Sequence, residues 1–291
     1  MDNAGTPEER RTGIGGSDAA AALGLSPWQT PYDLWEQKTG LAPPLEQTEP
    51  MLWGKLLEDI IRAEYGRRTG LEVRPVMDLM RHPRHAWMFA HIDGRIAHDG
   101  RVILEVKTAR TAQGWGVEDT DEIPLNYLTQ VHHYLAVTEA EICDVAVLIG
   151  GQDFRLYQVH RDLDIERDLI EGERAFWKLV EQRQAPPPVT LQDAVRRWGH
   201  FKAAGSVVAG EAEIAAVETL RALHRQKAEI EQLEEGAKLA LMEVMGEDGL
   251  NLVSPDGELL VTWALDNGRK GYSVAPREPS RRFLVKHLEE A

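Results

Sequence analysis

Apolar residues along this chain recur first with a helical period and then with a strand period. In the segment 51–69, Leu52, Leu56 and Ile60 share one helical face, and Gly70 ends the pattern. Later segments alternate or run apolar over short stretches, which is typical of strands. We therefore predict further helices at 19–23, 31–38, 125–138 and 164–184, and strands at 73–76, 87–96, 102–108, 144–149 and 154–159.

The pattern changes after Pro186-Pro187-Pro188, a stiff segment at which a domain can end. Residues 211–246 form one long, charged, amphipathic pattern, typical of a helix that packs in a hairpin or bundle. The segment 250–266 reads as two strands joined at Pro255-Asp256-Gly257. We expect a domain over residues 1–188, followed by an extension over 189–291 made of a long helix or helical hairpin and a β-hairpin.

Charged residues interrupt the predicted strand 102–108. Ile103, Leu104 and Val106 are expected to be buried. Glu105 lies between Leu104 and Val106, and Lys107 follows Val106. A buried charge must be paired or bind a metal, so these two residues are candidates for chemistry. The alternative is a solvated strand edge.

The turn at Asp99-Gly100 decides whether Asp93 lies beside Glu105. A two-residue turn would oppose Asp93 to Val106 and place the two carboxylates on opposite faces. A three-residue loop, His98 to Gly100, opposes Asp93 to Glu105 and puts Lys107 on the same face. Opposed Cβ atoms are about 4.5–5.5 Å apart, close enough for two carboxylates to share a cation. Two carboxylates and a lysine in this arrangement suit a magnesium-dependent phosphodiesterase.

Other polar residues are less distinctive on their own. Glu58 and Gln130 are compatible with surface positions on helices. Ser17 is compatible with a role as a helix cap, but a serine at the start of a helix with Arg10 nearby also suits an anion-binding site. Adjacent histidines His132 and His133 point about 100° apart on a helix, which argues against a shared metal.

Composition narrows the class of protein. The single cysteine, Cys143, excludes an internal disulfide framework and a cysteine-built metal site, and we expect it in the core. A net charge of -15 argues by itself against a nucleic-acid partner. The net charge is weak evidence, because the active site of a nuclease is itself acidic. The chain also contains pairs of basic residues, such as Arg10-Arg11 and Arg67-Arg68. No stretch suits a membrane span or a signal peptide, so we expect no membrane partner and a cytoplasmic location, in a bacterial or phage-infected cell.

Five linked motifs resemble one known family. They are Arg10 to Ala20 followed by Leu23 to Trp28, then Trp53-Gly54 to Glu58, Asp93-Gly94, Glu105-Val106-Lys107, and Tyr127 to Leu135 with Gln130, Val131 and Tyr134. Over about residues 8–185 the chain resembles the YqaJ-type viral recombinase nucleases, relatives of phage lambda exonuclease in the PD-(D/E)XK superfamily. The resemblance implies an α/β fold with a restriction-endonuclease-like core, in which helices flank a mixed central sheet.

The resemblance also implies roles for single residues. Two Mg²⁺ ions are expected at the site, and Mn²⁺ is expected to substitute for them. Asp93, Glu105 and the Val106 carbonyl would hold one ion, and Glu58 would help hold a second. Lys107 would orient and activate the attacking water, and Gln130 would position groups beside that water. Arg10 and Ser17 would bind the 5'-phosphate of the recessed strand.

The function implied is a Mg²⁺-dependent DNA exonuclease that digests linear double-stranded DNA from 5' to 3'. Its 3' overhangs would serve recombination through a single-strand annealing protein of the RecT or Beta type, and the family's rings imply a homo-oligomer, a trimer. Two alternatives stay open. One is a structure-selective or nicking endonuclease on the same fold, and the other is a module that recruits recombination proteins through the extension and carries a vestigial nuclease site.

Overall fold

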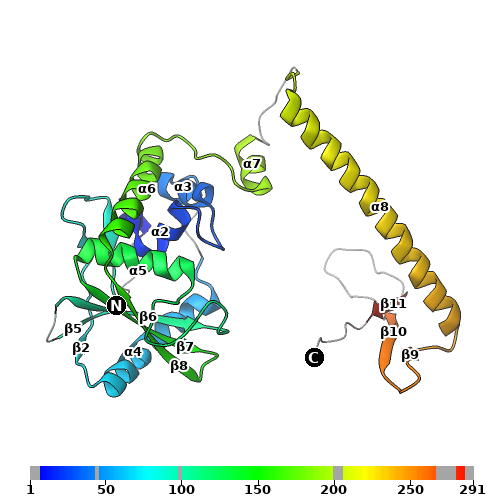
Figure 1. The fold of residues 1–291 in the computed structure, drawn as a ribbon, viewed down its shortest axis with the longest axis horizontal. Coiled ribbons are helices and arrows are strands. Elements are labelled where there is room, and N and C mark those ends of the chain that lie inside the picture. The colour runs from blue at the N-terminus through cyan, green and yellow to red at the C-terminus, as the bar shows by residue number, and fades with distance from the viewer. Residues whose placement is uncertain (1–6, 43–45, 98–99, 199–205, 267–279, 286–291) are drawn as a thin grey trace. The chain divides into compact units, whose positions relative to one another are not determined.

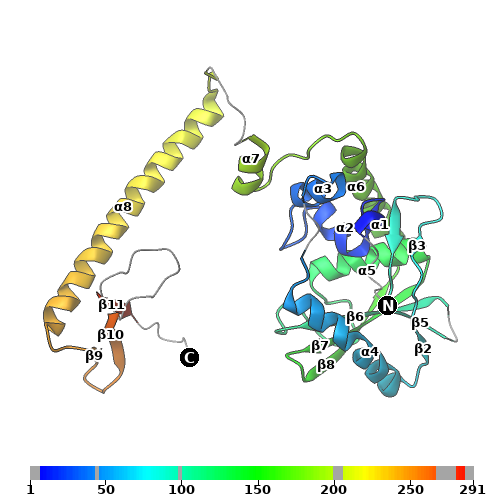
Figure 2. The same cartoon turned by 180° about the vertical axis from the view of Figure 1, so that it is seen from behind.

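The computed structural model describes residues 7–42, 46–97, 100–198, 206–266 and 280–285. The chain divides into two compact units, Met1–Lys202 and Ala203–Ala291. Figure 1 shows the elements of both units, and Figure 2 shows them from behind.

A five-stranded mixed sheet forms the centre of the first unit. Its strand order is β2-β5-β6-β7-β8. β5 and β6 pair antiparallel, β6 and β7 pair parallel, and β7 and β8 pair antiparallel. The crossover between the parallel strands runs through helix α5, as a parallel connection requires. The bounds are β2 Val73–Arg74, β5 Gly94–Ile96, β6 Val102–Ala109, α5 Leu125–Thr138, β7 Ile142–Ile149 and β8 Asp153–His160.

Helices cover both faces of this sheet (Figures 1 and 2). α5 and α6 (Leu163–Glu181) pack on one face, where Ile103 and Val145 meet Leu135 of α5. α4 (Glu49–Thr69) packs on the other face, where its Ile61 meets Leu104. Side chains on β6 therefore alternate between the two helical layers, and Glu105 shares the α5 side with Ile103.

A small second sheet stands beside the helices near the N-terminus. β4 (Met88–Ala90) pairs parallel with β1 (Ile14–Gly15) and antiparallel with β3 (Met80–Arg81). The single strand expected over 87–96 is thus wrong: β4 and β5 belong to different sheets, and Asp93 lies at the bend between them. α1 (Pro7–Arg10), α2 (Gly16–Ala22) and α3 (Pro31–Thr39) complete this end of the unit.

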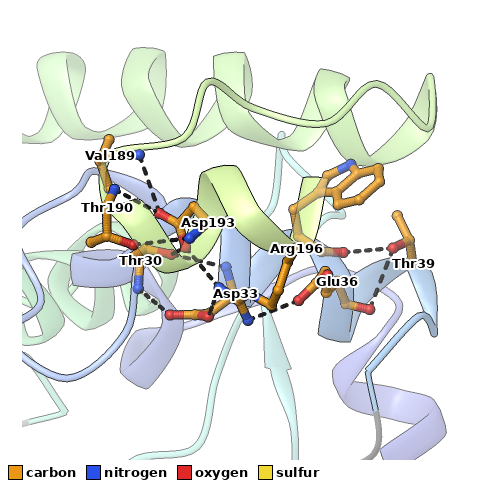
Figure 3. Close-up of polar contacts among 9 residues, drawn as sticks. Thr30, Asp33, Glu36, Thr39, Val189, Thr190, Asp193 and Arg196 are labelled. Atoms are coloured by element: carbon orange, nitrogen blue, oxygen red, sulfur yellow. Dashed lines mark hydrogen bonds and ion pairs between the residues drawn. The ribbon is translucent and has the colours of Figure 1, made fainter. Parts of the chain in front are cut away.

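Helix α7 (Leu191–Trp198), which the apolar pattern does not predict, is joined to α3 by polar contacts. Figure 3 shows Asp193 of α7 accepting hydrogen bonds from the Thr30 hydroxyl (3.1 Å) and from Arg196 (2.7 Å). Arg196 also reaches Asp33 of α3 at 2.5 Å. The Asp193 side chain is fully buried, so these donors compensate its desolvation. The first unit consequently extends beyond the 1–188 expected for the nuclease domain.

The second unit contains one long helix followed by strands. α8 (Glu211–Met245) is a single helix, as the charged pattern predicts. β9 (Asn251–Val253) pairs antiparallel with β10 (Leu259–Asp266) around the predicted turn, and β10 pairs antiparallel with β11 (Ser280–Val285). This helix and these strands lie within the residues 189–291 that the sequence assigns to the extension.

Among the residues that the structure describes, no helix is both long enough and apolar enough to cross a membrane.

Candidate active site

Strand register places Asp93 next to Glu105. Gly94 pairs with Leu104 and Arg95 with Ile103, and the same register continued by one residue opposes Asp93 to Glu105. The Val106 N–H donates to Asp93 Oδ2 at 2.8 Å, which fixes the Asp93 carboxylate at the end of the hairpin. The predicted register is therefore confirmed, whereas His98 and Asp99 of the predicted loop lie outside the described residues.

Glu105 is the most enclosed acid of the group, with 2% of the residue exposed. Its Oε1 accepts hydrogen bonds from Gln130 Nε2 (2.8 Å) and from Lys107 Nζ. Oε2 is buried and receives no hydrogen bond from a protein donor. Since a buried carboxylate oxygen needs a donor or a cation, this oxygen is the clearest sign that a further group belongs at the site.

The negative charges of Asp93 and Glu105 are unfavourable so close together in a buried position. Burial raises the pKa of Asp93 well above its ordinary value, and the neighbouring Glu105 charge raises it further. Burial likewise raises the pKa of Glu105, although Lys107 opposes this shift. Paired oxygens whose charges are this costly form a donor set that suits a hard divalent cation.

Lys107 lies beside both carboxylates. Burial alone would lower the pKa of Lys107, but the charges of Glu105 and Asp93 outweigh it and raise the pKa above the ordinary value. Its Nζ also lies 5.1 Å from the centroid of the Tyr127 ring. The ammonium is therefore held in its charged form, so Lys107 acts as a hydrogen-bond donor and a positive charge.

Gln130 links Glu105 to a residue that the sequence reasoning did not select as a site residue. Its Nε2 donates to the Tyr134 hydroxyl at 2.8 Å as well as to Glu105. Tyr134 is buried, and a Cβ atom on Gly16 would lie 2.2 Å from its ring. Only glycine at position 16 allows α2 to approach α5 this closely. The signal for Tyr134 was its place in the Tyr127 to Leu135 motif.

Glu58 lies near the pair but is engaged elsewhere. Burial and the Asp93 charge raise the pKa of Glu58, so it is within electrostatic reach of the site. Its Oε1, however, accepts from Arg62 at 2.5 Å on the same helix. In the described part of the chain, no three His, Cys, Asp or Glu side chains converge on one metal position. The donor set therefore fits one cation at Asp93 and Glu105, and Glu58 would have to leave Arg62 to help hold a second.

A second polar cluster gathers at the start of α2. Arg10 donates to the exposed Ser17 hydroxyl at 3.4 Å. Gly15, and not Ser17, is the N-cap residue of α2, and Asp18 Oδ2 accepts from the Gly15 N–H at 3.0 Å. Buried Lys38 donates to Asp18 Oδ2 and to the Arg10 carbonyl, both at 2.5 Å. The Ser17 hydroxyl is thus exposed beside Arg10 and can bind a ligand. The sequence alone does not predict that Lys38 and Asp18 hold this part of the backbone in place.

The remaining candidates have structural roles. His133 is fully buried between Glu173 Oε1 (2.8 Å) and the Phe89 carbonyl (2.9 Å), so both ring nitrogens are occupied. This agrees with the argument against a metal at His132 and His133. Cys143 is a buried free thiol in the core, as expected.

Part of the first unit is similar to a known protein family. Residues 8–141 match the model of the YqaJ-like viral recombinase domain, and this range contains Arg10, Ser17, Glu58, Asp93, Glu105, Val106, Lys107 and Gln130. This part of the chain is similar to the YqaJ-like viral recombinase family. It is 41% identical over 174 residues to the uncharacterized protein YqaJ of Bacillus subtilis (strain 168), a match that covers 58% of this chain and 53% of that relative.

Solved structures of other proteins are also similar to part of this chain. An alkaline exonuclease (LHK-Exo) from Laribacter hongkongensis is 20% identical with a TM-score of 0.49, covering 61% of this chain and 92% of that one. A phage-related exonuclease from Haemophilus somnus 129PT is 12% identical with a TM-score of 0.47, covering 62% and 98%. The fold class expected from the sequence, a PD-(D/E)XK-type mixed sheet flanked by helices, is confirmed by the strand order and by Asp93, Glu105 and Lys107 at its hairpin.

Proposed function

We propose that this protein is a Mg²⁺-dependent DNA exonuclease that digests linear double-stranded DNA from 5' to 3'. The observation that supports this most is the convergence of Asp93, Glu105 and Lys107, with a buried Glu105 oxygen that has no protein donor. Phosphodiester hydrolysis needs such acidic ligands for cations together with a nearby positive charge.

Asp93 and Glu105 would hold the cation, together with the Val106 carbonyl, and Glu58 would serve a second ion. A bound divalent cation would lower the pKa of an attacking water and polarise the phosphate. Mn²⁺ is expected to replace Mg²⁺, since both accept oxygen ligands.

The chain's own residues hold and orient the reacting groups. Lys107 carries a proton at neutral pH, so its ammonium can donate to the water and balance negative charge that develops on the phosphate. Gln130 restricts the Glu105 carboxylate through its hydrogen bond to Oε1. The Tyr134 hydroxyl accepts the second Gln130 proton and so keeps the amide in one orientation.

Arg10 and Ser17 would bind the terminal 5'-phosphate of the strand that is digested. A guanidinium and a hydroxyl are natural partners for a phosphate, and the Lys38–Asp18 pair fixes the backbone that carries them. Recognition of a 5'-phosphate would give the enzyme its polarity and leave a 3' overhang. A single-strand annealing protein of the RecT or Beta type is the partner that would use this product, and a ring-shaped homotrimer would keep an acidic protein on DNA.

Linear and closed DNA distinguish this proposal from an endonuclease on the same fold. We expect Mg²⁺-dependent release of mononucleotides from linear duplex that carries 5'-phosphates, slower release from 5'-hydroxyl ends, and no cutting of covalently closed circles. Ser17→Ala should reduce the preference for 5'-phosphate. Cleavage of closed circles as fast as linear duplex would refute the exonuclease and favour the endonuclease.

A further inference from the structure

A mostly exposed tryptophan lies next to the proposed active site, with its ring against Tyr127. Trp28 is 72% exposed, the highest value among the tryptophans that the structure describes. Its ring lies 6.2 Å from the ring of Tyr127, and Tyr127 in turn lies 5.1 Å from Lys107 Nζ. The indole is therefore connected to the lysine of the active site through one intervening aromatic ring.

The loop that carries Trp28 is held in a defined conformation. The Ser26 hydroxyl accepts from the N–H groups of Trp28 and Gln29, both at 3.3 Å. Thr30 then caps α3 by accepting from the Asp33 N–H at 3.1 Å. The indole is consequently presented to solvent by an ordered turn, which lowers the conformational cost of binding a ligand.

Tyr127 is supported from the protein interior. Its ring lies 5.7 Å from buried Trp115, which lies 5.3 Å from buried Tyr157. Four aromatic rings thus run from the core to the surface, and the outermost one, Trp28, is mostly uncovered. A flat ligand that stacked on Trp28 would bury apolar surface that the fold leaves in water.

We propose that Trp28, backed by Tyr127, forms a nucleobase-binding subsite that stacks on one base of the bound DNA. The subsite rests on the proposed function, because the phosphodiester that reacts would lie at Asp93, Glu105 and Lys107. At roughly 3.4 Å per base along a strand, the 5.1 Å and 6.2 Å distances through Tyr127 place the indole within a few nucleotides of Lys107. Stacking is tolerant of base identity, as a nuclease without sequence preference requires.

The test measures whether Trp28 and one base are energetically coupled, in EDTA so that no hydrolysis occurs. Binding of a 5'-phosphorylated duplex with a frayed end is compared with binding of duplexes that carry one abasic nucleotide at each of the first positions of either strand. The proteins are the wild type, Trp28→Ala, Trp28→Phe and Trp198→Ala. Trp198 is a matched control because it is 55% exposed on α7, where its ring contacts Arg197.

For the wild type, we expect one abasic position to weaken binding by about 5- to 150-fold, the range for loss of one base–aromatic stack. Trp28→Ala should bind the intact duplex more weakly by a similar factor and show no further loss at that position. Trp28→Phe should recover much of the affinity, and Trp198→Ala should behave like the wild type. In Mg²⁺, Trp28→Ala should raise KM much more than it lowers kcat.

The subsite would be refuted if Trp28→Ala bound the intact duplex as tightly as the wild type, or if the abasic penalty persisted in that variant. This result is separate from the fate of the nuclease proposal. A wild type that hydrolysed no DNA would defeat the proposed function, whereas the coupling measured in EDTA would still decide whether Trp28 stacks on a base.

Discussion

At the scale of single residues, the site depends on the groups that hold Glu105. Gln130 and Lys107 both donate to its Oε1, whereas Oε2 has no protein donor. A residue that orients a metal ligand usually contributes substantially to metal affinity and activity. The effects of removing Gln130 and of removing the Tyr134 hydroxyl should therefore differ.

Gln130→Leu should lower kcat by about 10- to 100-fold, the usual cost of losing a residue that orients a metal ligand. Tyr134→Phe should cost much less, because Gln130 would still donate to Glu105 and the ring would keep its contact with Gly16. Steady-state nucleotide release measures both, with circular dichroism to verify folding. Wild-type kcat in Gln130→Leu would contradict this role.

Metal binding should appear in stability as well as in activity. The pKa of Asp93 is raised in the folded protein by burial and by Glu105, so its carboxylate destabilises the fold increasingly as pH rises above the ordinary 3.8. Without metal at neutral pH, Asp93→Asn should therefore unfold at a higher temperature than the wild type. At a Mg²⁺ concentration of a hundred times its Kd, Mg²⁺ should stabilise the wild type by about 2.7 kcal/mol. It should stabilise Asp93→Asn less.

Calorimetry with and without Mg²⁺ makes this measurement, and Asp168→Asn, an exposed carboxylate on α6, is the control. Equal stabilisation of all three proteins by Mg²⁺ would show that the cation binds somewhere other than Asp93.

The sequence predicts that Asp93 lies opposite Glu105 because this geometry is local. Asp93 and Glu105 are joined by one hairpin, so turn length and strand alternation suffice to oppose them. Lys38, Asp18 and Tyr134 could not be assigned in this way. Their roles depend on α2 meeting α3 and α5 far away in sequence, and a single sequence does not show which distant helices meet.

At the scale of elements, α5 is fixed to its neighbours by a buried ion pair. His133 bridges Glu173 of α6 and the backbone of β4 at Phe89. Because α5 also carries Gln130, this bridge sets where the site amide lies. Periodicity predicts α5 and α6 because both have strong apolar faces, but it misses α7, whose place is fixed by Asp193 and Arg196 through polar contacts with α3.

The His133–Glu173 pair should make stability fall as pH rises. Burial alone would lower the pKa of His133, but Glu173 outweighs it and raises the pKa above 6.5. Burial raises the pKa of Glu173 too. The folded state thus holds more protons than the unfolded state, so the stabilisation by His133 is complete below pH 6.5 and is lost as pH rises through its raised pKa.

Urea unfolding across pH 6–9 tests this, with Glu173→Gln as the informative variant. Without the Glu173 charge, burial should lower the pKa of His133, and the loss of stability above pH 6.5 should disappear. His224→Gln, on the exposed surface of α8, should keep the wild-type profile. A wild-type slope in Glu173→Gln would assign the pH dependence to other groups.

At the scale of the whole molecule, the chain consists of a YqaJ-like unit and an extension of different character. The first unit ends at Lys202 and includes α7. The proline run at 186–188 predicts a boundary from local stiffness, but contacts with α3 carry the fold past it.

Two truncations should show where the first unit ends. A chain of residues 1–202 should unfold cooperatively, whereas 1–188 should be less stable by on the order of 1–2 kcal/mol, because Asp33 and Glu36 lose Arg196 and Thr30 loses Asp193. Urea unfolding monitored by tryptophan fluorescence compares them. Equal stabilities would mean that α7 contributes nothing to the unit.

The most direct test of the central claim is the release of nucleotides from end-labelled linear duplex by the wild type, Glu105→Gln, Lys107→Met and Lys227→Met. Lys227 lies on the exposed surface of α8 and serves as the lysine control. The account predicts Mg²⁺-dependent release by the wild type and by Lys227→Met, no release in EDTA, and a loss of about 100-fold or more in Glu105→Gln and Lys107→Met. Wild-type rates in both site variants, or release that persists in EDTA, would contradict the assignment of Asp93, Glu105 and Lys107 as the active site.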